Sequence, residues 1–266
     1  ETLQLLPKQR PELREITATV ALPEYLQQSQ PVVEDVRSGT LSVLKGSDAT
    51  LLASVSRQLQ VALIDGEQVP SDGEQIRTTF ARLDQDQQVA LSWRDEFGLL
   101  PRSPFELKIE TREDFAPQVT CSQLGRQQVV RVDQVVNFEV TADDDFGVKQ
   151  IGIEWQGLED PLTNPRPTSG SAILAAGNPE ATSLVTQATF NAAREKIPPQ
   201  TLQVRLFVVD YLPNREPVYS PPYTLFVMSH QEHANWLSER LKNWSQKAQG
   251  VYEREVQLYE ENKTLR

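Results

Sequence analysis

Residues 89–110 read VALSWRDEFGLLPRSPFELKIE, and residues 204–227 read VRLFVVDYLPNREPVYSPPYTLFV. The two stretches follow one plan: an alternating strand ends in an aspartate (Asp95 or Asp210), a turn follows, and a Ser-Pro pair precedes a final strand. Alternation of apolar and polar side chains is typical of strands with one face in a core. We therefore predict two β units of the same kind, each closing with a hairpin.

Further alternating runs lie on both sides of these hairpins, separated by turn-forming stretches such as KGSD and DGEQVPSDGE. Such runs predict antiparallel sheets with one buried face. The apolar members of these runs are Ile16, Ala18, Val20 and Leu22; Leu51, Ala53 and Val55; Leu59, Val61 and Leu63; Val136, Phe138 and Val140; and Ile151, Ile153 and Trp155.

The pattern predicts a mostly β chain of two tandem immunoglobulin-like β-sandwiches followed by a long C-terminal helix. We place an N-terminal linker at 1–13, the sandwiches at 14–113 and 114–228, and the helix at 229–266. The joint TREDFAP (111–117) is short and contains Pro117, so the sandwiches should lie roughly end to end. Trp93 and Trp155 are expected in the cores, and residues 157–183, rich in Pro, Gly and Ser, predict an extended loop or irregular edge.

The last segment changes to helical period. Ser229 followed by Glu232 forms a capping box. An apolar stripe then repeats every 3.5 residues, with Glu255 at one apolar position, which favours a coiled-coil-like helix about 50 Å long. The stripe either packs back on its own sandwich or binds a protein partner or a second copy. Its partner-binding residues are Leu237, Leu241, Trp244, Val251 and Leu258.

Composition narrows the function. A net charge of −11 disfavours nucleic-acid binding, and the sequence has neither a long apolar run nor a signal peptide. Catalytic and cofactor-binding motifs are missing, and the single Cys121 leaves the redox compartment open. We predict a protein without enzymatic activity or cofactor. The chain starts at Glu1 and stops inside a predicted helix, so we expect it to be part of a longer protein.

Residues 141–149, TADDDFGVK, join two strands through three aspartates. We interpret them as an Asx-type turn with Gly147 in a left-handed conformation. The alternative is a calcium site at the inter-domain joint, as in a calcium-dependent adhesion-type module, because calcium takes six to eight oxygen ligands. Its candidate ligands are Asp143, Asp144, Asp145, Glu113, Asp114 and Asp210. A carbohydrate-binding module is a further alternative, from architecture alone.

Four segments resemble a known family: ITATVALPEYL, LSVLKGSDATLLASVSRQLQVALI, LSWRDEFGLLPRSPFELKIETREDFAPQV and VNFEVTADDDFGVKQIGIEW. They are similar to the paired immunoglobulin-like region of large membrane-anchored proteins of planctomycetes and related bacteria, of the DUF4175-like kind. The resemblance implies an inner-membrane helix upstream of this chain, a periplasmic or otherwise extracytoplasmic location, and a helical region downstream. It implies no catalytic residue. The sequence thus predicts an exported scaffold segment that presents a helical partner-binding region.

Overall fold

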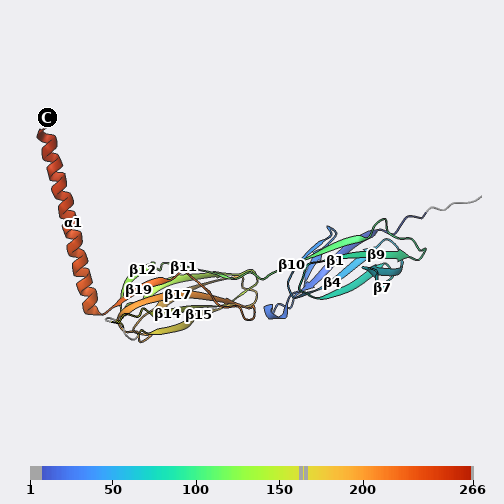
Figure 1. Ribbon diagram of the computed structural model, residues 1–266, viewed down its shortest axis with the longest axis horizontal. Coiled ribbons are helices and arrows are strands. Elements are labelled where there is room, and N and C mark those ends of the chain that lie inside the picture. Colours follow the sequence, from blue (N-terminus) through green and yellow to red (C-terminus); the bar gives the residue numbers. More distant parts are fainter. Residues whose placement is uncertain (1–7, 162–163, 165–166, 265–266) are drawn as a thin grey trace, which may run out of the picture.

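The computed structural model describes residues 8–161, 164 and 167–264. Residues 1–7 of the predicted linker and the last two residues of the predicted helix lie outside this part. The described chain forms two β-sandwiches and one long helix, as the sequence predicts (Figure 1).

The first sandwich contains two sheets that pack face to face. One has the strand order β2-β1-β4-β8-β7, and the other has the order β3-β10-β9-β5-β6. Its strands are β1 (Leu13–Ala21), β2 (Val32–Asp35), β3 (Thr40–Leu44), β4 (Ser47–Val55), β5 (Leu59–Ile64), β6 (Glu67–Val69), β7 (Ser71–Asp72), β8 (Gln75–Leu83), β9 (Gln87–Asp95) and β10 (Phe105–Arg112), and a short 3-10 helix, η1 (Glu24–Leu26), follows β1.

The second sandwich has a small sheet with the order β11-β13-β16 and a larger one with the order β12-β19-β17-β14-β15, where β18 also pairs with β17. Its strands are β11 (Gln118–Ser122), β12 (Gln127–Arg131), β13 (Val136–Asp143), β14 (Val148–Gly157), β15 (Ser169–Ala176), β16 (Ser183–Phe190), β17 (Gln200–Asp210), β18 (Val218–Tyr219) and β19 (Tyr223–Met228).

The closing hairpins found in the sequence occupy equivalent places in the two sandwiches. In the first, β9 pairs antiparallel with β10, and β10 pairs parallel with β3. In the second, β17 pairs antiparallel with β19, and β19 pairs parallel with β12. Each sandwich has its own apolar core, and Trp93 and Trp155 are buried in them as expected.

The buried face of β5 differs from the expectation. In β5, Ala62 and Ile64 are buried, whereas Leu59, Val61 and Leu63 were expected to share the buried face. The pairing of β5 with β9 is irregular between Leu59 and Val61. Because such an irregularity changes which side chains face the core, the alternation in the sequence does not predict the buried residues of β5. For residues 157–183 the structure favours the irregular edge over the extended loop, because β15 is an edge strand whose pairing with β14 is irregular between Ile151 and Gly152. Residues 162–163 and 165–166 of this stretch lie outside the described residues.

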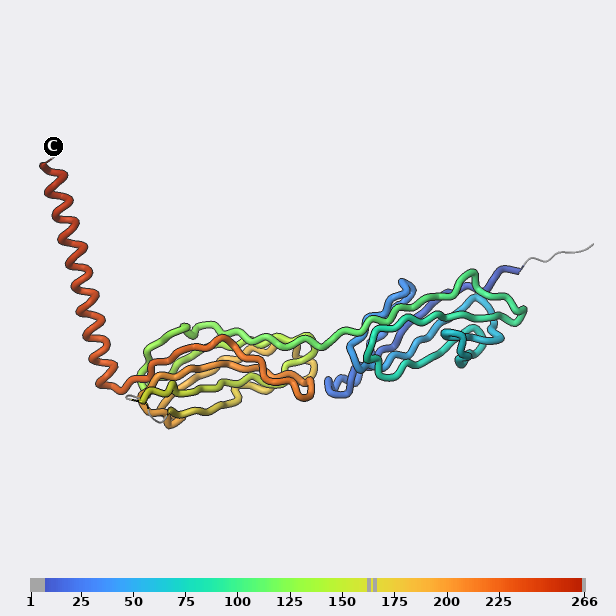
Figure 2. The backbone as a smooth tube through the Cα atoms, viewed as in Figure 1, coloured from blue at the N-terminus to red at the C-terminus, as the bar shows by residue number. Residues whose placement is uncertain are grey.

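The two sandwiches lie end to end, and the helix α1 (His230–Thr264) leaves the far end of the second one at a steep angle (Figure 2). Ser229 and Glu232 form the predicted capping box. The Ser229 backbone N–H donates to Glu232 Oε2 at 2.8 Å, and the Glu232 N–H donates to Ser229 Oγ at 3.2 Å.

This cap makes the first helical turn sensitive to acid. Hydrogen bonds from Ser229 lower the pKa of Glu232 below its ordinary value of 4.5. The ionised carboxylate therefore stabilises the start of the helix fully above pH 4.5, and this stabilisation is lost as the pH falls through the folded-state pKa. Glu232→Gln keeps an acceptor without a charge and should remove this dependence. The prediction is checked by measuring the hydrogen-exchange protection of the amides in the first helical turn as a function of pH. Glu239→Gln, on the same helix beyond the cap, should retain the wild-type profile.

Candidate functional sites at the helix and the joint

The terminal helix presents its predicted stripe to solvent. No residue of the described helix is buried, and Trp244 has 68% of its surface exposed. The other predicted members, Leu237, Leu241, Val251 and Leu258, are exposed as well. Tyr252, Val256 and Tyr259 add further exposed apolar surface. Contiguous apolar surface of this kind marks interaction sites, because exposing it to water is unfavourable.

The alternative in which the helix folds back along its own sandwich is wrong. The main contacts of the helix with strands are those of its first turns with β12 and β19, and beyond that point it projects away from both sandwiches (Figure 1). At its start, His230 Nε2 lies 3.6 Å from Asp133 Oδ2, and the His233 ring lies 5.7 Å from that of Trp236. The stripe is therefore not used in the fold of the described chain.

The second site is the joint between the sandwiches, and the TADDDFGVK turn lies at its centre. Phe146 is only 8% exposed and packs against Leu26 and Leu44 of the first sandwich. Gln28 Nε2 donates to the carbonyl oxygens of Phe146 (3.3 Å) and Pro179 (2.8 Å). The turn is thus a contact between domains, a role that the sequence alone did not indicate.

The predicted turn forms, but for a different reason at its glycine. Asp144 Oδ2 accepts hydrogen bonds from the backbone N–H groups of Phe146 (3.3 Å) and Gly147 (2.8 Å), as an Asx-type turn requires. Gly147 is not left-handed, contrary to expectation. A Cβ atom there would lie 2.6 Å from the carbonyl oxygen of Pro179, so close packing excludes a side chain.

The structure brings together three of the six candidate metal ligands. Carboxylate oxygens of Asp114, Asp144 and Asp210 lie within 4.8 Å of one another. The other three do not join this group: Asp143 ends β13, Asp145 pairs with Arg112 at 3.8 Å, and Glu113 pairs with Lys45 at 3.0 Å.

A guanidinium group lies inside this acidic cluster. Arg215 Nη1 donates to Asp114 Oδ1 at 3.0 Å, to the Phe115 carbonyl oxygen at 2.6 Å, and to Asp210 Oδ2. Its Nη2 donates to the Asp114 carbonyl oxygen. The side chains of Arg215, Asp114 and Asp210 are 17%, 6% and 3% exposed, so the ion pairs are largely screened from water. Arg215 thus supplies the positive charge that a bound cation would supply.

The electrostatics of the joint show competing effects. Burial, together with the charges of Asp114 and Asp144, raises the pKa of Asp210 although Arg215 lowers it. Burial alone would lower the pKa of Arg215, but the charges and hydrogen bonds of Asp210 and Asp114 outweigh it and raise that pKa. The Tyr25 hydroxyl donates a hydrogen bond to Asp114 Oδ2 at 2.8 Å. Burial and this hydrogen bond raise the pKa of Tyr25, so the hydroxyl stays protonated and continues to donate. Partial burial and the charges of Asp114 and Asp144 raise the pKa of Asp145, against the pull of Arg112.

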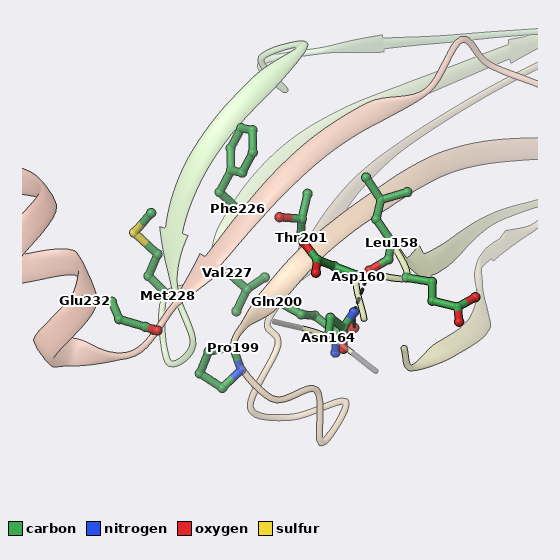
Figure 3. A pocket seen from close by; sticks show the side chains of 11 residues that line it. Leu158, Asp160, Asn164, Pro199, Gln200, Thr201, Phe226, Val227, Met228 and Glu232 are labelled. Atoms are coloured by element: carbon green, nitrogen blue, oxygen red, sulfur yellow. Dashed lines mark hydrogen bonds between the residues drawn. The ribbon is translucent and has the colours of Figure 1, made fainter. Parts of the chain in front are cut away.

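A third feature is a groove of about 510 Å³ beside the start of the helix (Figure 3). Gln200 Oε1 accepts hydrogen bonds from Asn164 Nδ2 (3.0 Å) and from the Thr168 N–H (3.2 Å), and Asn164 Nδ2 also donates to the Leu158 carbonyl oxygen (2.7 Å). These polar groups are bonded to one another, and among the described lining residues Phe226 is the one aromatic side chain. The groove offers no aromatic platform of the kind that the carbohydrate-binding alternative needs.

No helix in the described part of the chain is long and apolar enough to cross a membrane. No protein-family model matches the chain, and no curated protein is similar to it in sequence.

Several solved structures match the chain weakly. Fibronectin(III)-like modules of CbhA from Clostridium thermocellum are 11% identical, with 72% of this chain and 90% of that one covered and a TM-score of 0.28. The IG1+IG2 pair of DIP-gamma is 12% identical, with 84% and 99% covered and a TM-score of 0.25. A DUF3823 family protein from Bacteroides ovatus is 11% identical, with 65% and 90% covered and a TM-score of 0.27. Likenesses this weak carry no functional inference, and the assignment of two sandwiches rests on the strand pairing.

Proposed function

We propose that this chain is a non-enzymatic structural segment that holds a partner-binding helix at the end of a β-sandwich rod. The observation that carries the proposal is the 35-residue helix α1, of which no described residue is buried although it carries a stripe of large apolar side chains. A surface helix normally gains its stability by packing such a stripe against something. A second polypeptide is the occupant that the chain itself does not provide.

The rod is suited to holding the helix at a distance. The sandwiches contact each other through Phe146, Gln28 and the Tyr25–Asp114 hydrogen bond, so the joint is more than a flexible linker. We further propose, from the family resemblance of the sequence, that the segment lies outside the cytoplasm and is anchored to the inner membrane by another part of the full-length protein.

The test of this function targets the stripe. Leu241→Glu combined with Trp244→Glu should abolish partner binding, because two charges would replace apolar side chains at adjacent positions of the stripe. A photo-crosslinker at Ser245, in cells that make the protein, should give an adduct with a defined protein in the wild type and lose it in the double variant. Both sandwiches should unfold within about 0.5 kcal/mol of the wild type, as for other exposed positions.

Leu52→Glu with Ile173→Glu is the matched control, because both side chains are exposed apolar groups on strands of the sandwiches. This control should keep the adduct. The proposal would be refuted if the Leu241→Glu, Trp244→Glu variant still formed the adduct. It would also be refuted if that variant unfolded the second sandwich.

A further inference from the structure

The charged residues beside the helix stripe limit the kinds of partner that can bind it. The stripe has two interleaved rows of heptad spacing. One row is apolar from residue 237 to residue 258 and consists of Leu237, Trp244, Val251 and Leu258, and His230 precedes it in the first turn of the helix. The other consists of Leu241, Ala248 and Glu255 and therefore places a carboxylate in the seam. In a coiled coil these rows meet the partner, and the two flanking rows decide which partner is accepted.

The flanks differ from each other. From residue 238 to residue 259 one flank is basic and consists of Arg240, Lys247 and Arg254, which we call the basic row. The same flank ends with Glu261 in the last turns of the helix, and the other flank consists of Ser238, Ser245, Tyr252 and Tyr259. From residue 240 to 252 the helix has three basic side chains and no acidic one, in a chain whose net charge is −11. No ion pair in the described part of the chain engages the basic row, although Arg240 stacks on Trp236. These charges are thus available to a partner.

A second copy of the chain fits this pattern poorly in either direction. Antiparallel helices place equivalent flanks against each other, so the basic row of one copy would face that of the other. Parallel helices place equivalent seam residues against each other, so Glu255 would face Glu255 of the second copy. Like charges opposed in an interface cost several kcal/mol and act against the wrong partner.

We propose that the stripe binds an α-helix of another protein that has an apolar seam, an acidic flank facing Arg240, Lys247 and Arg254, and a basic residue facing Glu255. This inference rests on the proposed function and specifies its partner. The apolar seam supplies the area removed from water, and the opposed charges select the partner and its alignment.

The probe is a designed 28-residue helical peptide with leucine in its seam, glutamate on both flanks, and one lysine in the seam opposite Glu255. Its counterpart has lysine on both flanks and glutamate in the seam. We expect the whole chain to bind the acidic peptide at least tenfold more tightly than the basic one at low salt, measured by titration calorimetry. In sedimentation the chain alone should remain a monomer at micromolar concentration.

Reversal of the basic row, Arg240→Glu with Lys247→Glu and Arg254→Glu, should exchange the preference between the two peptides. The matched control changes Glu239, Glu253 and Glu260 to lysine on the face opposite the stripe, and it should keep the wild-type preference. Equal affinity for the two peptides, or dimers of the chain tighter than its complex with the acidic peptide, would overturn the inference.

The same titration separates this inference from the function on which it rests. Binding that is lost with Leu241→Glu and Trp244→Glu but shows no preference for charge would remove only the proposed partner chemistry. Binding of either peptide that is unaffected by that double variant would show that the stripe is not the docking surface, and both proposals would fail.

Discussion

Replacing Arg215 with methionine is expected to lower the free energy of unfolding of the second sandwich by about 3–5 kcal/mol, the cost typical of removing one partner of a buried ion pair. The substitution leaves Asp114 and Asp210 largely buried without their cation, and it removes donors from the carbonyl oxygens of Asp114 and Phe115. Urea denaturation followed by circular dichroism measures the loss. Arg194→Met is the control, because that side chain is 60% exposed and pairs only at the surface.

A second substitution tests the cause of the loss. Adding Asp210→Asn to Arg215→Met should recover part of the stability, because one fewer buried carboxylate then lacks a counter-charge. A loss for Arg215→Met no larger than that for Arg194→Met would show that the buried ion pairs contribute little.

Calcium separates the two interpretations of the acidic cluster. Millimolar calcium should leave the wild-type melting temperature unchanged, because the Arg215 guanidinium group already lies between Asp114 and Asp210 and pairs with both carboxylates. The adhesion-type alternative requires the opposite, since a cation that binds only the folded state raises its stability. A rise of several degrees in the wild type would therefore favour a calcium site over the ion pairs with Arg215.

Most of the fold was predictable because it depends on local patterns. Alternation along β4, β9, β13, β14, β17 and β19 identified strands whose alternate side chains are buried. The aspartates that end the two matching strands are both buried. Asp95 Oδ1 accepts hydrogen bonds from the N–H groups of Phe97 and Leu99, and Asp210 Oδ1 accepts one from that of Leu212. The repeated sequence plan therefore reflects a repeated turn.

The joint could not be predicted in the same way, and two nearly identical tetrapeptides show why. DEFG at 95–98 and DDFG at 144–147 both use their first aspartate to bond the N–H group of the phenylalanine. Yet Phe97 is 50% exposed, whereas Phe146 is almost completely buried against the other sandwich. Gly98 has a left-handed φ of 76°, whereas Gly147 is required by the nearby Pro179 backbone. The difference arises from contacts more than 100 residues distant in sequence, such as that of Phe146 with Leu26 and Leu44.

Arg215 illustrates the same limit at the acidic cluster. The carboxylates were visible in the sequence as a possible cation site, but Arg215, which pairs with two of them, lies 5 residues after Asp210 and 101 residues after Asp114. A weak signal was present, because an arginine occurs in the turn that follows a strand-ending aspartate. The helix stripe needed no such long-range information, since its period and cap are local.

Replacing Phe146 with serine is expected to uncouple the two sandwiches while leaving each one folded. Phe146 belongs to neither main core, and its ring fills a small apolar cluster with Leu26 and Leu44 at the joint. Burial of a phenylalanine side chain contributes about 2 kcal/mol, so the equilibrium between docked and undocked sandwiches should shift about thirtyfold. Single-molecule energy transfer between dyes on the two sandwiches, in a Cys121→Ser background, should show a broader distance distribution.

Phe97→Ser is the matched control, because it removes the same side chain from the similar tetrapeptide where the ring is half exposed and contacts no second sandwich in the described chain. The distance distribution of this variant should match that of the wild type. If the distance distribution of Phe146→Ser is as narrow as that of the wild type, the polar contacts of Tyr25, Gln28 and Arg112 suffice to fix the joint. If the distribution broadens, the position of the helix relative to the first sandwich depends on one buried ring, and the reach of the partner-binding helix can be altered without changing the helix itself.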